Sequence, residues 1–139
     1  MKELTPLAEA LSKFAHLGQK YGTEDYYSYH VTGIVNSLKL HNLSESYLIV
    51  GLLHDVVEDT EVTLETIVNL FGEDIGHAVD AITKREGESR ENYLVRCSSN
   101  KISRIVKLHD AMFNATNCFK NKNKSKYNYY LETISKLTA

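Results

Sequence analysis

The chain has 139 residues, 42% of them hydrophobic, and a formal net charge of −2. This length and composition can fill one hydrophobic core, so we expect a single domain over residues 1–139. The charge balance provides no basic field for nonspecific nucleic-acid binding. We expect neither a signal peptide nor a membrane span, because no run of 18 apolar residues occurs. Cys97 and Cys118 lack a C-x-x-C spacing, which indicates free thiols in a soluble, cytoplasmic protein.

Apolar residues recur at helical spacing along almost the whole chain. The first helix is expected at about residues 6–20, with Thr5 as its N-cap and Pro6 as its first residue. A second helix is expected at about 25–41. A third helix follows Ser44 and is apolar on every side, which indicates a central position. From the third helix onwards, the expected helices cover residues 46–59, 63–72, 73–84, 89–99, 101–119 and 126–137.

The later helix boundaries carry signals of their own. Thr63 and Ser89 are expected to cap helices, and Gly72 is expected to end one. No run of residues alternates with the period of a strand, and no internal repeat is visible. The sequence therefore predicts an all-α fold, a helical bundle of about seven to eight helices.

The stretch LHDVVEDT at residues 53–60 places charged groups at the end of the most apolar segment. A buried charge is costly unless it is paired or bound to a metal. His54 and Asp55 can both reach one ion at the flank of a helix, and Glu58 and Asp59 follow them by one helical turn. The alternative for the last two is a solvated helix end, but the helix dipole disfavours acids at a C-terminus. We therefore interpret the stretch as a functional site.

Two more polar residues lie within apolar stripes of other predicted helices, His30 and Asp110. Either one alone is more often a hydrogen-bonded polar group of the core than a metal ligand. Together with His54 and Asp55 they supply the four imidazole and carboxylate groups that a divalent metal requires. The four residues together favour a metal site.

This pattern resembles the HD-domain phosphohydrolases, in which a histidine, a later His-Asp pair and a still later aspartate hold a metal. The matching positions are His30, His54, Asp55 and Asp110. The stretch HDVVEDT narrows the resemblance to the alarmone hydrolases, which comprise the hydrolase domain of RelA/SpoT proteins and small stand-alone relatives. Other similar segments follow the same order, at residues 15–19, 63–75, 82–84 and 106–114.

The resemblance implies a Mn²⁺-dependent 3′-pyrophosphohydrolase that acts on guanosine tetra- and pentaphosphate. It implies that Glu58 and Asp59 handle the attacking water beside the metal. It also places substrate-binding roles on the matching residues Thr23, Tyr27, Lys107 and Asn114. For Lys107, the residue pattern alone favours a side chain that extends from a helix edge into solvent.

One segment departs from the pattern of the alarmone hydrolases. Between Gln19 and His30 the family typically reads R-K-S-G-E-P-Y, whereas this chain has Tyr21 and Gly22 in place of the arginine and lysine. A tyrosine can stack on a purine, but it carries no charge and reads the base differently. We therefore expect Tyr21 to contact the nucleotide and guanine specificity to be reduced.

Three alternatives stay open at this point. One is an HD phosphohydrolase for another nucleotide, and another is a noncatalytic HD module that binds a nucleotide. The third is a helical di-iron protein, which requires further histidine ligands. His16 and His109 are the candidates for such ligands, but both fit a packed, hydrogen-bonded core histidine better. The sequence leaves open whether the chain forms a homo-oligomer.

Overall fold

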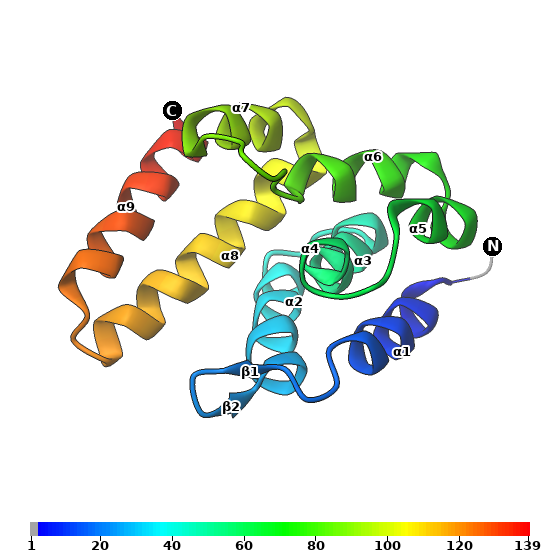
Figure 1. Cartoon of the computed structure of the whole chain (residues 1–139), viewed down its shortest axis with the longest axis horizontal. Coiled ribbons are helices and arrows are strands. Elements are labelled where there is room, and N and C mark those ends of the chain that lie inside the picture. The colour runs from blue at the N-terminus through cyan, green and yellow to red at the C-terminus, as the bar shows by residue number, and fades with distance from the viewer. Residues whose placement is uncertain (1–2) are drawn as a thin grey trace.

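The computed structural model describes residues 3–139, and it confirms the predicted all-α fold (Figure 1). Within these residues, the only strands form a hairpin of two residues each. In chain order the elements are α1 (Thr5–Ala15), β1 (Lys20–Tyr21), β2 (Glu24–Asp25), the π-helix η1 (Tyr26–Val31), α2 (Thr32–Leu40), α3 (Glu45–Leu53), α4 (Val56–Asp59), α5 (Leu64–Phe71), α6 (Glu73–Ile82), α7 (Arg90–Ser99), α8 (Lys101–Lys120) and α9 (Lys124–Thr138).

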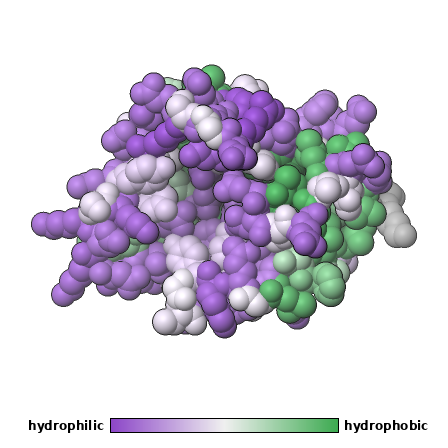
Figure 2. Space-filling model, in the orientation of Figure 1, coloured by the Kyte–Doolittle hydropathy of each residue, from purple (hydrophilic) through white to green (hydrophobic). Residues whose placement is uncertain are grey.

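Helix α3 lies at the centre of the bundle, as its uniform hydrophobicity predicts, and packs against α1, α2, α6 and α8. Leu52 and Leu53 of this helix are almost completely buried. Burial of such a side chain contributes roughly 1.5–3 kcal/mol. Helices α8 and α9 pack side by side along one flank, and α1 and α5 lie on the opposite flank (Figure 1). Hydrophobic side chains gather on the surface of this opposite flank, while most of the remaining visible face is hydrophilic (Figure 2).

The first helix is shorter than predicted, and its cap is different. It ends at Ala15, and the chain then turns at Gly18, whose φ of 82° is a left-handed conformation that glycine tolerates best. The predicted cap, Thr5, lies inside the helix. The N-terminus of α1 is instead capped by Glu45, a residue of α3. The Glu45 carboxylate accepts hydrogen bonds from the backbone N–H groups of Leu4 and Thr5 at 3.0 and 3.3 Å.

The segment between the first two predicted helices forms the β1–β2 hairpin, in which Lys20 pairs with Asp25 and Tyr21 with Glu24. The predicted helix at 25–41 is divided into η1 and α2. At the junction the backbone N–H of Thr32 donates to the carbonyl of Tyr27, which is the i to i−5 spacing of a π-helix. π-Helical turns occur frequently at functional sites.

The predicted helix at 46–59 is interrupted after Leu53. The His54 imidazole accounts for the break, because its Nδ1 lies 2.7 Å from the carbonyl oxygen of Gly51. In a continuous helix that carbonyl would accept from the N–H of Asp55 instead. The chain resumes as α4, so His54 and Asp55 lie at a turn between two helices.

The predicted caps of the later helices are confirmed, whereas α6 ends at Ile82, two residues before the predicted end, and α9 begins at Lys124, two residues before the predicted start. The side chains of Thr63 and Ser89 accept hydrogen bonds from the backbone of the first helical turn, and α5 ends at Gly72. Cys97 and Cys118 are free and buried. Among residues 3–139, every helix is too short or too polar to span a bilayer.

Candidate metal centre

Three of the predicted metal ligands meet in the interior, each from a different part of the fold. His30 comes from η1, His54 from the turn after α3, and Asp110 from the middle of α8. Nε2 of His30 lies 3.0 Å from Oδ1 of Asp110, and Nε2 of His54 lies 3.6 Å from the same oxygen. One ligand atom from each residue falls within 4.8 Å of the other two, which is close enough to share one ion.

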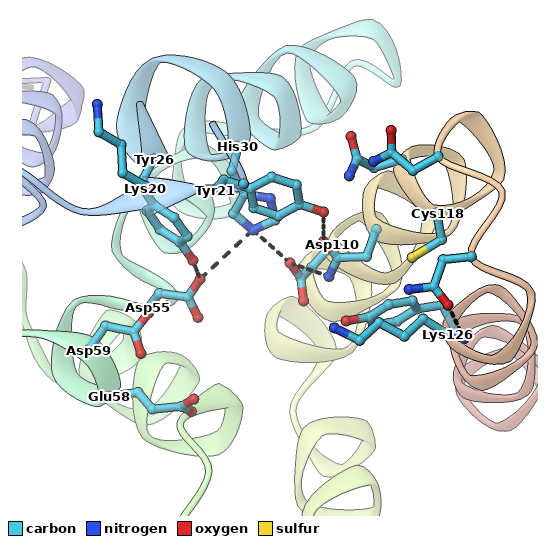
Figure 3. Close-up of a pocket in the computed structure, with 16 residues that line it drawn as sticks. Lys20, Tyr21, Tyr26, His30, Asp55, Glu58, Asp59, Asp110, Cys118 and Lys126 are labelled. Atoms are coloured by element: carbon cyan, nitrogen blue, oxygen red, sulfur yellow. Dashed lines mark hydrogen bonds and ion pairs between the residues drawn. The ribbon is translucent and has the colours of Figure 1, made fainter. Parts of the chain in front are cut away.

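The fourth predicted ligand, Asp55, lies at the edge of this group (Figure 3). Its Oδ2 is 2.9 Å from Nε2 of His54 and 3.9 Å from Nε2 of His30. The break between α3 and α4 permits this approach, because neighbouring side chains in a regular helix point about 100° apart.

The hydrogen bonding of His54 fits a metal ligand. Its Nδ1 faces the carbonyl of Gly51, which can only accept, so Nδ1 keeps its proton and Nε2 is the nitrogen that can offer a lone pair to an ion. That Nε2 is buried and makes no hydrogen bond within the described residues, although it faces the carboxylates of Asp55 and Asp110. Metal-binding histidines typically donate their other N–H to a backbone carbonyl in this way. The donor set therefore fits a divalent cation.

The electrostatics of the site also favour a cation. Burial alone disfavours charge on Asp110, but Lys107 and the imidazoles of His30 and His54 hold the pKa of this carboxyl well below its usual range. Nζ of Lys107 donates to Oδ2 of Asp110 at 3.0 Å. Burial likewise disfavours charge on His54, but Asp55 and Asp110 raise its pKa well above the usual value. Two negative carboxylates thus converge on the space between the imidazoles.

The two predicted acid–base residues line the same cavity as three of the predicted ligands, His30, Asp55 and Asp110. Partial burial and the nearby Asp55 carboxylate raise the pKa of both Glu58 and Asp59. Glu58 accepts a 2.9 Å hydrogen bond from the backbone N–H of Lys84, and Asp59 accepts one of 3.2 Å from the amide of Gln19. Their basicity and fixed position suit groups that accept a proton near the cluster.

The cavity has a volume of about 510 Å³, and its walls come from the hairpin, the ligand helices and the α8–α9 corner. Tyr21 and Asn114 both line it, as expected for substrate-binding residues. They also bond to each other, since the Tyr21 hydroxyl donates to Oδ1 of Asn114 at 2.7 Å. Asn114 in turn donates to Oδ1 of Asp110 at 3.4 Å.

The structure does not bring every predicted substrate-binding residue to the cavity. Thr23 is exposed at the tip of the hairpin, and neither Thr23 nor Tyr27 is among the lining residues. The Lys107 ammonium turns inward to Asp110 and not outward to solvent, in contrast to the expectation from its position on the helix edge.

Several lining residues were not predicted from the sequence. Tyr26 is buried, and its hydroxyl donates to Oδ2 of Asp55. Its position four residues before His30, on the same helical face, was the available signal. Lys126 lies in the first turn of α9 and lines the cavity. Tyr130 and the asparagines of the α8–α9 corner line it as well: Asn117, Asn121 and Asn123.

The two histidines considered for a second metal are packed and hydrogen-bonded. Nδ1 of His16 lies 2.7 Å from Oε1 of Gln19, the residue whose amide holds Asp59. Nδ1 of His109 lies 2.7 Å from Oγ of Ser37, on the side of α8 that faces α2. Neither belongs to the cluster of potential metal ligands found among the described residues.

Comparisons with known proteins define the family. The family described as HD domain matches residues 8–137, so the chain belongs to the HD-domain family. A probable GTP pyrophosphokinase of Mycobacterium leprae is 32% identical over 108 residues, covering 71% of this chain and 14% of the relative. A GTP pyrophosphokinase of Myxococcus xanthus is 40% identical over 80 residues, covering 55% of this chain and 10% of the relative.

A solved structure shares the fold over nearly the whole chain. It is a metazoan orthologue of SpoT that hydrolyses ppGpp, with a TM-score of 0.80 and 21% sequence identity. The alignment covers 99% of this chain and 86% of that chain. The similarity therefore shows that the chain shares the fold of this SpoT orthologue.

Proposed function

We propose that the protein is a metal-dependent nucleotide pyrophosphohydrolase that removes the 3′-pyrophosphate of guanosine tetra- and pentaphosphate. The observation that carries this proposal is the cluster of His30, His54 and Asp110 with Asp55 beside it, next to a cavity that Glu58 and Asp59 also line. The fold shared with a ppGpp-hydrolysing protein and the sequence similarity to GTP pyrophosphokinases support the substrate class.

Two imidazoles and two carboxylates form a donor set that suits Mn²⁺, since no thiolate belongs to the cluster. His30, His54, Asp55 and Asp110 would hold the ion. A divalent ion in such a site supplies Lewis acidity towards a phosphoryl group and lowers the pKa of water.

The Lys107 ammonium supports a single metal and disfavours the di-iron alternative. It donates to Oδ2 of Asp110, while Oδ1 faces the two imidazoles. A carboxylate whose outer oxygen is bonded to an ammonium cannot readily bridge to a second cation, because the two positive charges would repel each other.

Two acidic side chains of the protein would accept the proton of the attacking water. Glu58 and Asp59 have raised pKa values and line the cavity on the side of Asp55, so either is suited to take a proton from the attacking water (Figure 3). Lys20 and Lys126 at the cavity wall add positive charge that attracts the polyphosphate. We place this activity in the cytoplasm, where Cys97 and Cys118 remain reduced.

A related activity on another nucleotide is favoured by one observation. Tyr21 lines the cavity where the alarmone hydrolases have a charged residue, and its hydroxyl is bonded to Asn114. An uncharged side chain whose hydroxyl is already hydrogen-bonded contributes little to recognition of the base. An HD phosphohydrolase that acts on a different nucleotide is therefore the second candidate.

The test is to incubate the purified chain with Mn²⁺ and a panel of nucleotides with free or 3′-phosphorylated riboses. Phosphorus NMR then identifies the products. Pyrophosphate release from the 3′-phosphorylated guanosine nucleotides supports the first candidate, and orthophosphate release from other nucleotides supports the second. Asp55→Asn is the control, because loss of a ligand should abolish both metal retention and turnover.

A further inference from the structure

Two tyrosines from a single short segment are linked to the carboxylate ligands of the candidate metal site, one directly and one through Asn114. Tyr21 ends β1, and Tyr26 begins η1. Their rings approach each other and His30, with centroids 6.4 Å apart between the tyrosines and 4.7 and 5.0 Å from the imidazole. The segment of residues 21–26 thus presents two phenol hydroxyls to the cavity (Figure 3).

Tyr26 contacts a ligand directly. Its hydroxyl donates to Oδ2 of Asp55, the same oxygen that lies 2.9 Å from Nε2 of His54. Since the Asp55 side chain retains some exposure, 21%, this hydrogen bond is what fixes its orientation towards the imidazoles. A carboxylate oxygen has two lone pairs, so Oδ2 can accept from Tyr26 and still bind a cation.

Tyr21 contacts the ligand Asp110 indirectly, through Asn114. Its hydroxyl donates to Oδ1 of Asn114, and Nδ2 of Asn114 donates to Oδ1 of Asp110. Its ring also stacks on His30 with an interplanar angle of 13°. This stacking matters because Nδ1 of His30 is buried without a hydrogen-bond partner among the described residues, so the ring lacks the usual polar anchor of a metal-binding histidine.

We propose that Tyr26 and Tyr21 are positioning residues, whose hydroxyls hold the Asp55 and Asp110 carboxylates in the orientation that binds the metal. The inference rests on the proposed metal-dependent function and adds to it the outer hydrogen bonds of the site. Such partners typically change metal affinity by about ten- to hundredfold when they are removed.

Replacement by phenylalanine tests the hydroxyls alone, because it leaves the rings and their packing in place. Tyr29→Phe is the matched control. Tyr29 belongs to the same segment, and its hydroxyl donates to Oδ1 of Asn117 on α8 at 2.8 Å. Within the described residues, no hydrogen bond connects Asn117 to a predicted ligand.

The measurement is Mn²⁺ binding to the full chain without nucleotide, by isothermal titration calorimetry. We expect Tyr26→Phe to raise the Kd about ten- to hundredfold. Tyr21→Phe should raise it by a smaller factor, because its effect passes through the 3.4 Å contact of Asn114 with Asp110. Tyr29→Phe should leave it unchanged. The electron paramagnetic resonance spectrum of bound Mn²⁺ should change in the first two variants only, which general loosening of the fold would not produce.

Each outcome is decisive. Equal affinities of Tyr26→Phe and Tyr29→Phe would overturn the proposal. If Tyr26→Phe did not fold, unchanged affinity and spectrum in Tyr21→Phe would overturn it, and altered values there would support it. Failure of the unaltered chain to bind Mn²⁺ would instead contradict the proposed function, so the two failures are distinguishable.

Discussion

The Lys107 ammonium donates a 3.0 Å hydrogen bond to Oδ2 of Asp110, a carboxylate that is only 7% exposed. The other oxygen of Asp110 faces His30 at 3.0 Å. One residue therefore neutralises the outer side of the carboxylate, while its inner side remains available to a cation. This arrangement links the stability of α8 to the occupancy of the metal site.

Lys107→Met should destabilise the metal-free protein. Removing one partner of a buried ion pair leaves an uncompensated charge, which costs about 3–5 kcal/mol. Because Lys107 is partly exposed, we expect the free energy of unfolding to fall by about 2–3 kcal/mol. Urea denaturation in EDTA measures this change. Lys101→Met, on the exposed first turn of the same helix, is the control. Mn²⁺ should stabilise Lys107→Met more than the unaltered chain. Equal destabilisation by both variants would contradict the role of this pair.

Glu58→Gln and Asp59→Asn should retain the metal but lower kcat by about a hundredfold or more, the usual scale for an acid–base group. Neither residue belongs to the cluster of potential ligands, and both line the same cavity. Elemental analysis checks metal content, and steady-state kinetics with saturating substrate check turnover. Glu65→Gln, on the exposed surface of α5, is a suitable control. Normal turnover in both active-site variants would reduce these acids to surface charges.

The ion pair of Glu88 with Arg96 should make stability depend on pH. Arg96 donates to both oxygens of Glu88, at 2.6 and 2.7 Å, and lowers the pKa of Glu88 from 4.5 to about 2. A depressed folded-state pKa contributes stability that is fully present above the unfolded value and is lost as the pH falls through the folded value. The pair therefore stabilises the loop before α7 above about pH 4.5 and stops doing so near pH 2.

Glu88→Gln tests this dependence. The difference in unfolding free energy between the unaltered chain and the variant should be largest at neutral pH and shrink as the pH falls towards 2. Urea titrations across this range measure it. The loop also holds Glu58, through the N–H of Lys84, so the variant should lower turnover modestly as well. A difference that stays constant with pH would contradict the assignment.

The sequence predicted the residues of the cluster better than the backbone that positions them. His30, His54 and Asp110 were identifiable as polar residues within apolar helical stripes, but the π-helix that carries His30 was not predicted. The break after Leu53 was not predictable from periodicity, because it depends on the His54 side chain taking the carbonyl of Gly51. Lys126 likewise reaches the cavity only through the packing of α9 on α8, a tertiary contact without a local signal.

The last prediction concerns the base. One face of the Tyr21 ring stacks on His30 and its hydroxyl is bonded to Asn114, so the residue offers a nucleotide little beyond its remaining ring surface. Stacking contributes about 1–3 kcal/mol and discriminates poorly between purines. We therefore expect the ratio of kcat/KM for guanosine and adenosine 3′,5′-bis(diphosphates) to stay below about a hundredfold. Tyr21→Arg should raise this ratio even if it weakens metal binding, because the ratio compares two substrates on the same protein. A much larger ratio in the unaltered chain would mean that another residue recognises the base. If the protein hydrolysed neither substrate, that result would favour an HD phosphohydrolase for a different nucleotide.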